Sequence, residues 1–148
     1  MPTPTYDLLA SSVLTGTVSS LTFSSLPSDY RDLVIVMKAA SGNQFWMRIN
    51  GDTGSNYFHL RMRGDGSTAD SGTATETVAE FMQSFSASAL LAIAQINDYS
   101  ATNKQKIILA RGGSADSGVS GQAIRWASTA AITELTFRSE ERRVGKEC

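Results

Sequence analysis

The chain has 148 residues, with 13 Lys and Arg against 14 Asp and Glu, and a net charge of −1. This length is typical of one domain that can bury enough surface to fold without disulfides or a structural metal. The balanced charge argues against nucleic acid as the main partner, because nucleic-acid-binding domains usually carry an excess of Lys and Arg. No stretch approaches the ~20 apolar residues of a membrane span, and residues 1–5 lack the features of a secretory signal. We therefore expect neither a nucleic-acid partner nor a membrane partner.

Residues 1–137 contain 19 Ser and 14 Thr, with short apolar runs between polar clusters. This pattern favours short strands over helices. In chain order, the predicted strands are 6–14, 19–24, 32–40, 45–50, 57–63, 75–82, 90–96, 104–111, 122–127 and 132–137. A short helix within 75–91 is the alternative for that segment, because Val78, Phe81 and Met82 have helical spacing.

Two alternating segments, 45–50 and 57–63, flank a connection rich in Gly, Asp and Asn. We expect them to pair as a β-hairpin with one apolar, buried face. Trp46 would then pair with Arg61, and Arg48 with His59. The opposite face would carry the candidate binding residues, which combine aromatic rings with basic or polar groups: Trp46, Arg48, Tyr57, His59 and Arg61.

Residues 33–37 and 107–109 are apolar on both faces, which predicts central strands. About ten short strands with polar connections indicate an all-β, antiparallel β-sandwich of jelly-roll type. Segments 64–72 and 112–121 are expected to be loops at hairpin ends, and no linker divides residues 1–137, which form one domain. The predicted core residues are Leu33, Ile35, Met37, Phe45, Met47, Ile49, Phe58, Leu60 and Ile108.

Residues 1–137 contain one His and no Cys, so a Cys-His pair is excluded and the usual zinc ligands are missing. No Gly-x-Ser-x-Gly pattern marks a nucleophile for His59, which we expect on an exposed strand face. The loop aspartates follow no calcium-binding pattern. Residues 63–65 match the Arg-Gly-Asp adhesion tripeptide, but a turn is the preferred interpretation. We expect no enzymatic activity, no cofactor and no metal.

Residues 138–148 differ sharply in composition, since seven of the eleven are charged. They resemble the translation of a common short-read sequencing adapter, and a natural charged tail is the alternative. We expect this tail to lie outside the fold and the natural chain to continue beyond Phe137. The single Cys148 belongs to the tail and carries no redox information.

Three groups of segments carry a family resemblance: 6–10 with 21–34, then 48–57, and finally 96–104 with 126–133. They include Leu-Pro-Ser-Asp-Tyr-Arg-Asp at 26–32 and Asn-Gly-Asp-Thr-Gly-Ser-Asn at 50–56. In this order they resemble a family of small tailed-phage virion proteins. Members of that family usually continue into a further Gly-rich strand, where this chain has the adapter-like tail.

The resemblance implies a non-enzymatic virion structural protein, of fibre or capsid-decoration type, made in the cytoplasm of a bacterial host. Its expected partners are other virion proteins and further copies of itself. The alternative is a carbohydrate- or receptor-binding module that recognises a host surface glycan through the aromatic-basic face, since sugar recognition uses aromatic rings with flanking hydrogen-bonding groups. A depolymerase comes third, because no pair of carboxylates at hydrolase geometry can be located.

Overall fold

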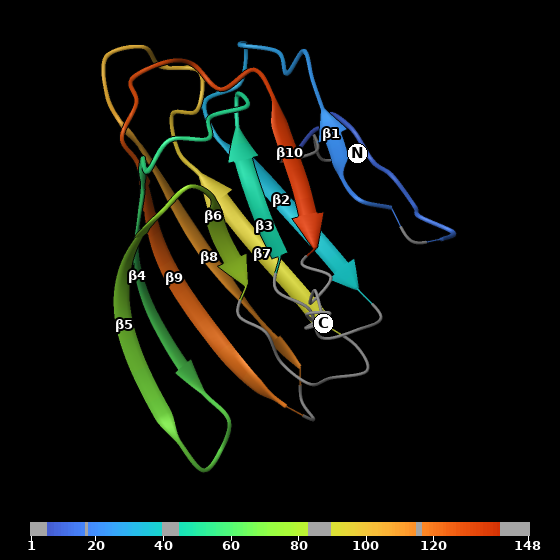
Figure 1. Ribbon diagram of the computed structural model, residues 1–148. Coiled ribbons are helices and arrows are strands. Elements are labelled where there is room, and N and C mark those ends of the chain that lie inside the picture. The colour runs from blue at the N-terminus through green and yellow to red at the C-terminus, as the bar shows by residue number, and fades with distance from the viewer. Residues whose placement is uncertain (1–5, 17, 40–44, 83–89, 115–116, 140–148) are drawn as a thin grey trace, which may run out of the picture.

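A computed structural model describes residues 6–16, 18–39, 45–82, 90–114 and 117–139. Within these ranges the regular secondary structure consists of ten strands and no helix (Figure 1). The strands are β1 (Leu21–Phe23), β2 (Leu33–Ala39), β3 (Phe45–Ile49), β4 (Tyr57–Gly64), β5 (Ala69–Glu76), β6 (Ala79–Met82), β7 (Leu90–Ile96), β8 (Lys106–Ser114), β9 (Gly118–Trp126) and β10 (Leu135–Ser139). The all-β prediction is therefore confirmed.

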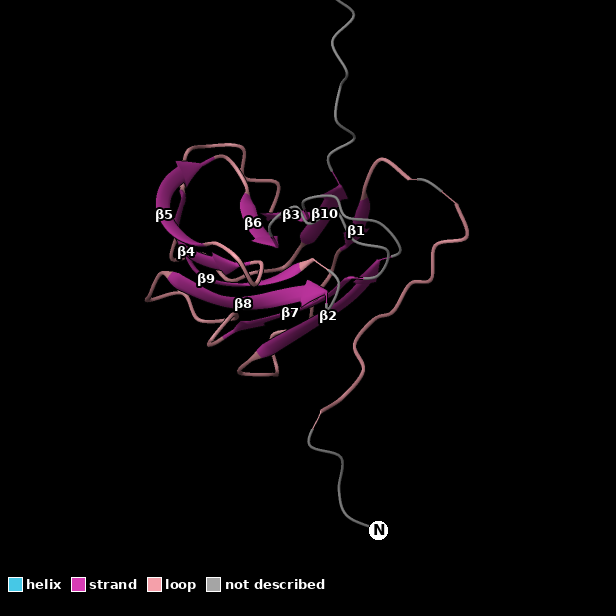
Figure 2. Cartoon of the chain, turned by 90° about the horizontal axis from the view of Figure 1, so that it is seen from below, coloured by secondary structure: helices cyan, strands magenta, loops and turns pink. Residues whose placement is uncertain are grey.

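The strands form two antiparallel sheets that pack face to face as a β-sandwich (Figure 2). The smaller sheet has the order β1-β10-β3-β6, and the larger has the order β2-β7-β8-β9-β4-β5. Residues from the inner faces of both sheets form one core, which includes Met47 and Ile49 of β3 together with Ile108 of β8 and Ile124 of β9. Burial of these side chains is the main stabilising contribution to the fold.

The predicted hairpin between 45–50 and 57–63 is wrong, because β3 and β4 belong to different sheets. β3 pairs with β10 and β6, whereas β4 pairs with β5 and β9. The connection begins with Asn50 and Gly51, which both have positive φ angles, 51° and 67°. They lie in a turn that the backbone N–H of Asp52 closes by donating to the carbonyl oxygen of Ile49 at 2.9 Å. Alternating polarity predicted both strands correctly but could not identify their partners.

The core prediction is correct for Leu33, Met47, Ile49 and Ile108, which are buried. Three further predicted core residues, Ile35, Met37 and Phe45, are half-buried and pack against the core. The predictions for the other two residues, Phe58 and Leu60, are wrong.

Phe58 is 40% exposed and Leu60 is 54% exposed. β4 turns Tyr57 and His59 inward instead, so its apolar side chains lie on the outer face of the larger sheet. The inner positions of β4 are therefore occupied by polar and amphipathic side chains, and this arrangement is the reverse of the usual pattern.

The apolar segment 33–37 was expected to be central, but β2 lies at the edge of the larger sheet, whereas β8 is interior as predicted. β2 is apolar on both faces because its outer residues Val34 and Val36 continue the exposed apolar surface of the sheet. Segments 64–72 and 112–121 do lie at the ends of hairpins as predicted, β4–β5 and β8–β9. They are largely strand and not loop, since β5 begins at Ala69 and β8 and β9 extend into the second segment.

Segment 6–14 contains no strand in the structure. Residues 75–82 are divided between β5 and β6 and contain no helix, and the remainder of the proposed helical segment, 83–89, lies outside the described residues. Strand β10 includes Arg138 and Ser139, which pair with Trp46 and Phe45. The expectation that the whole of 138–148 lies outside the fold is therefore wrong for its first two residues, and residues 140–148 are outside the described part of the chain.

Candidate functional site

Tyr57 was predicted on an exposed face, but its side chain is fully buried. The backbone N–H of Ile49 donates a hydrogen bond to its hydroxyl oxygen at 3.0 Å, and the hydroxyl donates to the carbonyl oxygen of Asp52 at 3.3 Å. Burial raises the pKa of Tyr57 to about 12. Tyr57 therefore joins the two sheets at the connection between β3 and β4 and is not available to a ligand.

His59 is also buried, with only 2% of its surface exposed. Its Nε2 lies 2.9 Å from the carbonyl oxygen of Val78, so this nitrogen carries the proton and donates it. Burial lowers the pKa of His59 below its ordinary value, and the hydrogen bond to Val78 only partly opposes this shift. The neutral imidazole thus fastens the segment between β5 and β6 to the inner face of β4.

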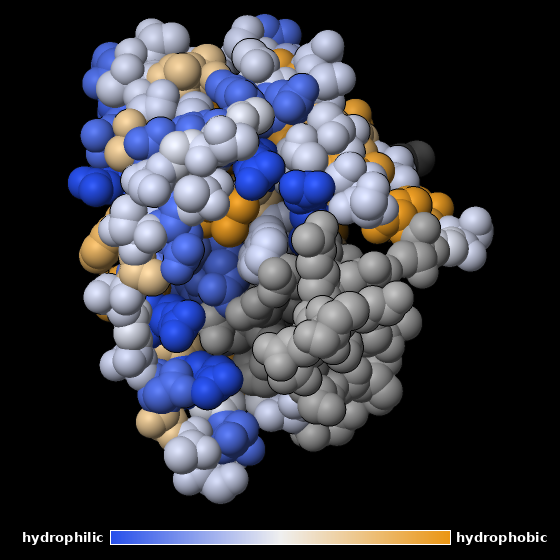
Figure 3. All heavy atoms as spheres, viewed as in Figure 1, coloured by the Kyte–Doolittle hydropathy of each residue, from blue (hydrophilic) through white to orange (hydrophobic). Residues whose placement is uncertain are grey.

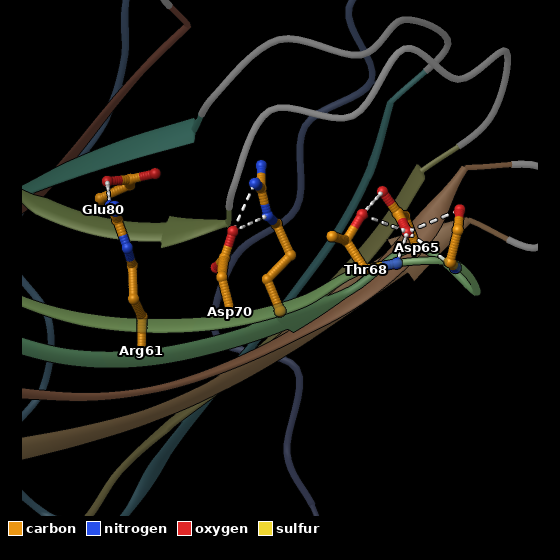
Figure 4. Close-up of polar contacts among 7 residues, drawn as sticks. Arg61, Asp65, Thr68, Asp70 and Glu80 are labelled. Carbon is orange, nitrogen blue, oxygen red and sulfur yellow. Dashed lines mark hydrogen bonds and ion pairs between the residues drawn. The ribbon is translucent and has the colours of Figure 1, made fainter.

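The remaining three predicted binding residues lie on two strands that belong to different sheets. Trp46 and Arg48 are half-buried on β3, on the side of that strand opposite to Met47 and Ile49. Arg61 lies on the inner side of β4, in the other sheet, where its guanidinium is 3.8 Å from the carboxylate of Glu80 on β6 (Figure 4). The five residues therefore do not form the single aromatic-basic face that the hairpin required, and whether any of them binds a ligand stays a prediction.

The turn after β4 explains the Arg-Gly-Asp tripeptide. The Asp65 carboxylate accepts hydrogen bonds from the backbone N–H groups of Ser67 and Thr68, at 2.9 and 2.7 Å, and from both hydroxyls (Figure 4). The bonds from Thr68 and Ser67 lower the pKa of Asp65 to about 2. Arg63 pairs with Asp70 across the hairpin at 2.5 Å. Both charged groups are occupied within the protein, which supports the turn interpretation.

The segments that carry the family resemblance meet at one end of the sandwich. The hydroxyl of Tyr99 donates to the carbonyl of Pro27, and the N–H of Ile132 donates to the carbonyl of Tyr99 at 2.9 Å. Asn50 accepts a bond from the N–H of Thr133 at 2.9 Å. Segments far apart in the sequence are thus tied together, so the residues of the resemblance form a hydrogen-bonded scaffold at this end of the fold.

Sequence reasoning missed an exposed apolar surface, which lies on the outer side of the larger sheet. Here nine apolar side chains are between 36% and 68% exposed. We call them the outer apolar face: Val34, Val36, Phe58, Leu60, Met62, Leu91, Ile107, Leu109 and Val119. They lie on β2, β7, β8, β9 and β4, with Arg125 placed 5.8 Å from the Phe58 ring centre. The sequence does contain strands that are apolar on both faces. This pattern predicted burial of both faces, whereas one of them is exposed.

The opposite side of the molecule has a different character. Figure 3 shows that the described residues on the side of the smaller sheet are mainly hydrophilic, with strongly hydrophilic residues gathered in a hollow near the middle of the view. On this sheet Thr22 and Thr136 exchange a hydroxyl hydrogen bond at 3.0 Å. Among the described residues, nine of the fifteen exposed large apolar side chains lie on the outer apolar face, and the other six lie in residues 6–30.

Among the described residues, no group of three or more His, Cys, Asp or Glu side chains is placed to hold a metal ion. The described segments also include no helix with the length and apolar character needed to cross a membrane. A comparison of the chain with protein-family models, curated proteins and solved structures finds no match.

Proposed function

We propose that this chain is a non-enzymatic structural protein of a phage virion, a fibre component or capsid decoration with a jelly-roll type of sandwich. It acts by assembly and surface contact. The virion context comes from the resemblance of its segments to tailed-phage proteins. The observation that supports assembly is the outer apolar face, because a large group of exposed apolar side chains on a folded domain commonly marks an interaction site.

The occupant that we propose for this face is a second copy of the chain. The nine apolar residues lie on five neighbouring strands, which span roughly 19 Å at about 4.8 Å per spacing, and strands of seven or eight residues extend about 25 Å. The face therefore measures on the order of 480 Å², and two copies packed face to face would bury about 1,000 Å² in total. This area is typical of a weak, reversible interface. A two-fold axis that lies in the plane of contact would relate the two copies and close the pair.

The centre of the face suits such a contact. Leu60, Ala123 and Leu109 lie side by side on β4, β9 and β8. The basic residues of the face lie in other rows, because Arg125 is opposite Phe58, Arg111 is opposite Gly121 and Lys38 is opposite Leu91. A pair centred on the Leu60–Leu109 row would therefore bring apolar side chains together at its middle. Arg111 and Arg125 lie in the rows on either side, and the uncharged Gln95 lies next to Leu109.

Sedimentation equilibrium of the full chain tests this proposal. We expect a dimer at tens of micromolar, and we expect the double variant Leu60→Thr, Leu109→Thr to dissociate at least ten-fold more readily, because Thr keeps the strand propensity and removes apolar area. The matched control is Leu8→Thr, Val13→Thr, which alters two residues that are more than 80% exposed outside the sheets. A monomeric parent chain, or a double variant that dimerises as the parent does, would contradict assembly through this face.

The virion context has its own test, which is the sequence of the DNA that flanks this gene. Tail, portal or terminase genes beside it would support the proposal, and an operon of metabolic genes would contradict it. A glycan-binding role through Trp46, Arg48, Tyr57, His59 and Arg61 has lost the geometry on which it was based.

A further inference from the structure

Two neighbouring inner positions of β9 carry buried polar groups without partners. Gln122 is 5% exposed and Ser120 is 6% exposed. Within the part of the chain that the structure describes, neither the amide nitrogen nor the amide oxygen of Gln122 has a hydrogen-bond partner, and the same is true of the Ser120 hydroxyl. Leaving a buried polar group unpaired costs about 1–3 kcal/mol, and native proteins rarely keep such groups without a reason.

The strands beside β9 surround these groups with charge on one side and small residues on the other. On β4, Arg61 lies opposite Gln122 and Arg63 lies opposite Ser120. On β8 the corresponding neighbours are Ala110 and Gly112. Side chains this small leave the Gln122 amide uncrowded by its own sheet. The inner surface of β9 is therefore bordered by charged side chains on β4 and by small residues on β8.

This polar cluster reaches the surface. The side chains of Arg61, Arg63 and Asp70 are 39%, 42% and 49% exposed, so exposure rises from Gln122 toward the β4–β5 hairpin. Figure 1 shows that β4, β5 and β9 continue beyond the end of β6 at this end of the sandwich. Arg61 is held by a long ion pair of 3.8 Å to Glu80, and its Nε lies 3.5 Å from the position of a Cβ on Gly72. Since Arg61 is the cross-strand neighbour of Gln122 on this side, a ligand that enters from the β4–β5 end would have to displace this side chain.

The charges of the cluster identify the chemical class of a ligand. Arg61 faces Glu80 and Arg63 pairs with Asp70 (Figure 4), so the formal charges balance and neither an anion nor a cation is favoured. The groups without partners are a neutral amide and a neutral hydroxyl, which both donate and accept hydrogen bonds. A ligand that satisfies them needs donors and acceptors side by side and no net charge. Adjacent hydroxyl groups of a sugar have this property.

We propose that Gln122, Ser120 and Arg61 form a binding site for a neutral saccharide unit, entered from the β4–β5 end of the sandwich. This site is distinct from the outer apolar face, which lies on the other side of the same sheet. It also differs from the aromatic-basic face that the sequence predicted, with which it shares only Arg61. The two proposals therefore succeed or fail separately.

The test uses the full chain and a panel of glucose, galactose, mannose and N-acetylglucosamine, each followed by saturation-transfer NMR up to about 50 mM. We expect at least one sugar to bind. Gln122→Met, which keeps the length of the side chain and removes both hydrogen-bonding atoms, should weaken that binding at least ten-fold. Its melting temperature should stay equal to the parent value or rise, because an unpaired buried amide is removed. Gln105→Met is the matched control, since Gln105 is exposed in the connection before β8 and lies outside both sheets.

Three results would overturn the proposal. The first is that no sugar in the panel binds. The second is that Gln122→Met binds the sugar as the parent does. The third is that Gln122→Met lowers the melting temperature by several degrees, which would mean that ordered water or another protein group already satisfies the amide. A change in oligomeric state tests the outer apolar face and has no bearing on these outcomes.

Discussion

The indole N–H of Trp126 donates a 2.7 Å hydrogen bond to Oδ2 of Asp52, and this bond joins the end of β9 to the connection between the two sheets. Asp52 also accepts bonds from the N–H of Gly54 at 2.8 Å and from the side-chain amide of Asn56 at 2.9 and 3.1 Å. Burial by itself would raise the pKa of Asp52, but the bonds from Trp126, Asn56 and Gly54 outweigh it and the pKa is lowered. One carboxylate therefore organises the crossing from β3 to β4.

We predict that Asp52→Asn destabilises the protein by about 1–3 kcal/mol, because an amide offers one acceptor oxygen where the carboxylate offers two. Urea unfolding at pH 7 measures the change. Since the pKa of Asp52 is lowered in the folded state, its contribution is present above the ordinary value near 3.8 and is lost as the pH falls through the folded value. Asp29→Asn at an exposed position is the control. Equal stability of the two variants would show that this network is not needed for the crossing.

The crossing also explains how far the sequence predicts the fold. Alternating polarity identifies β3, β4 and β7 with useful bounds, because a strand presents successive side chains to opposite faces. Partner choice is set by contacts distant in sequence, such as Asp52 with Trp126, and no local pattern reveals them. A hairpin was therefore a reasonable expectation for 45–63, and it was wrong.

The candidate site failed for a related reason. The sequence places Tyr57 and His59 together on one face of β4, and this is correct. The buried face of β4 is the one whose side chains form hydrogen bonds inside the protein, Tyr57 with Ile49 and His59 with Val78. The apolar side chains of β4 remain on the outer surface. Hydrophobicity alone assigned Phe58 and Leu60 to the core, since the usual rule is that apolar side chains are buried.

The single histidine makes the pH dependence of stability simple to interpret. His59 has a lowered pKa because it is buried, so between its folded value and the ordinary 6.5 the unfolded chain binds a proton that the folded chain does not. The contribution of the neutral His59 to the free energy of unfolding is therefore fully present above pH 6.5 and decreases as the pH falls below it. We expect the midpoint of urea unfolding to drop between pH 7.5 and pH 5.5, and His59→Gln to remove this slope. A parent protein with no slope in this window would contradict the neutral, buried assignment.

Lys106 is fully buried, and its ammonium group donates to three backbone carbonyls, those of Ala101 at 2.7 Å, Lys104 at 2.9 Å and Thr129 at 3.3 Å. Lys106→Met would keep the aliphatic stem and leave three carbonyl groups without this donor. We expect a loss on the order of 3 kcal/mol, because hydrogen bonds to charged groups are worth about 1.5–3 kcal/mol each and solvent can replace part of them.

Thermal unfolding of Lys106→Met should be compared with that of Lys104→Met. The side chain of Lys104 is 52% exposed and pairs with Asp98 at 3.0 Å, and such a surface pair contributes at most about 1 kcal/mol. If both variants lose the same small amount, Lys106 does not hold the loops at this end of the sandwich together.

Two glycines on the outer face of the larger sheet provide the last prediction, because they differ in the space around them. A Cβ on Gly113 would lie 2.4 Å from the carbonyl oxygen of Gly118 and 2.9 Å from the Cα of Val119, and both are backbone atoms that cannot move independently. A Cβ on Gly121 would meet only the Cγ of Met62, at 3.7 Å, which is an ordinary contact. We expect Gly113→Ala to destabilise the protein by about 1–3 kcal/mol, since the β8–β9 pairing must be displaced. Gly121→Ala should change stability by less than about 1 kcal/mol, because its backbone loses freedom in the unfolded chain and gains no clash in the folded one. Urea unfolding of both variants at pH 7 measures the difference, and a Gly113→Ala protein as stable as Gly121→Ala would mean that β8 and β9 do not approach each other as closely as the structure shows.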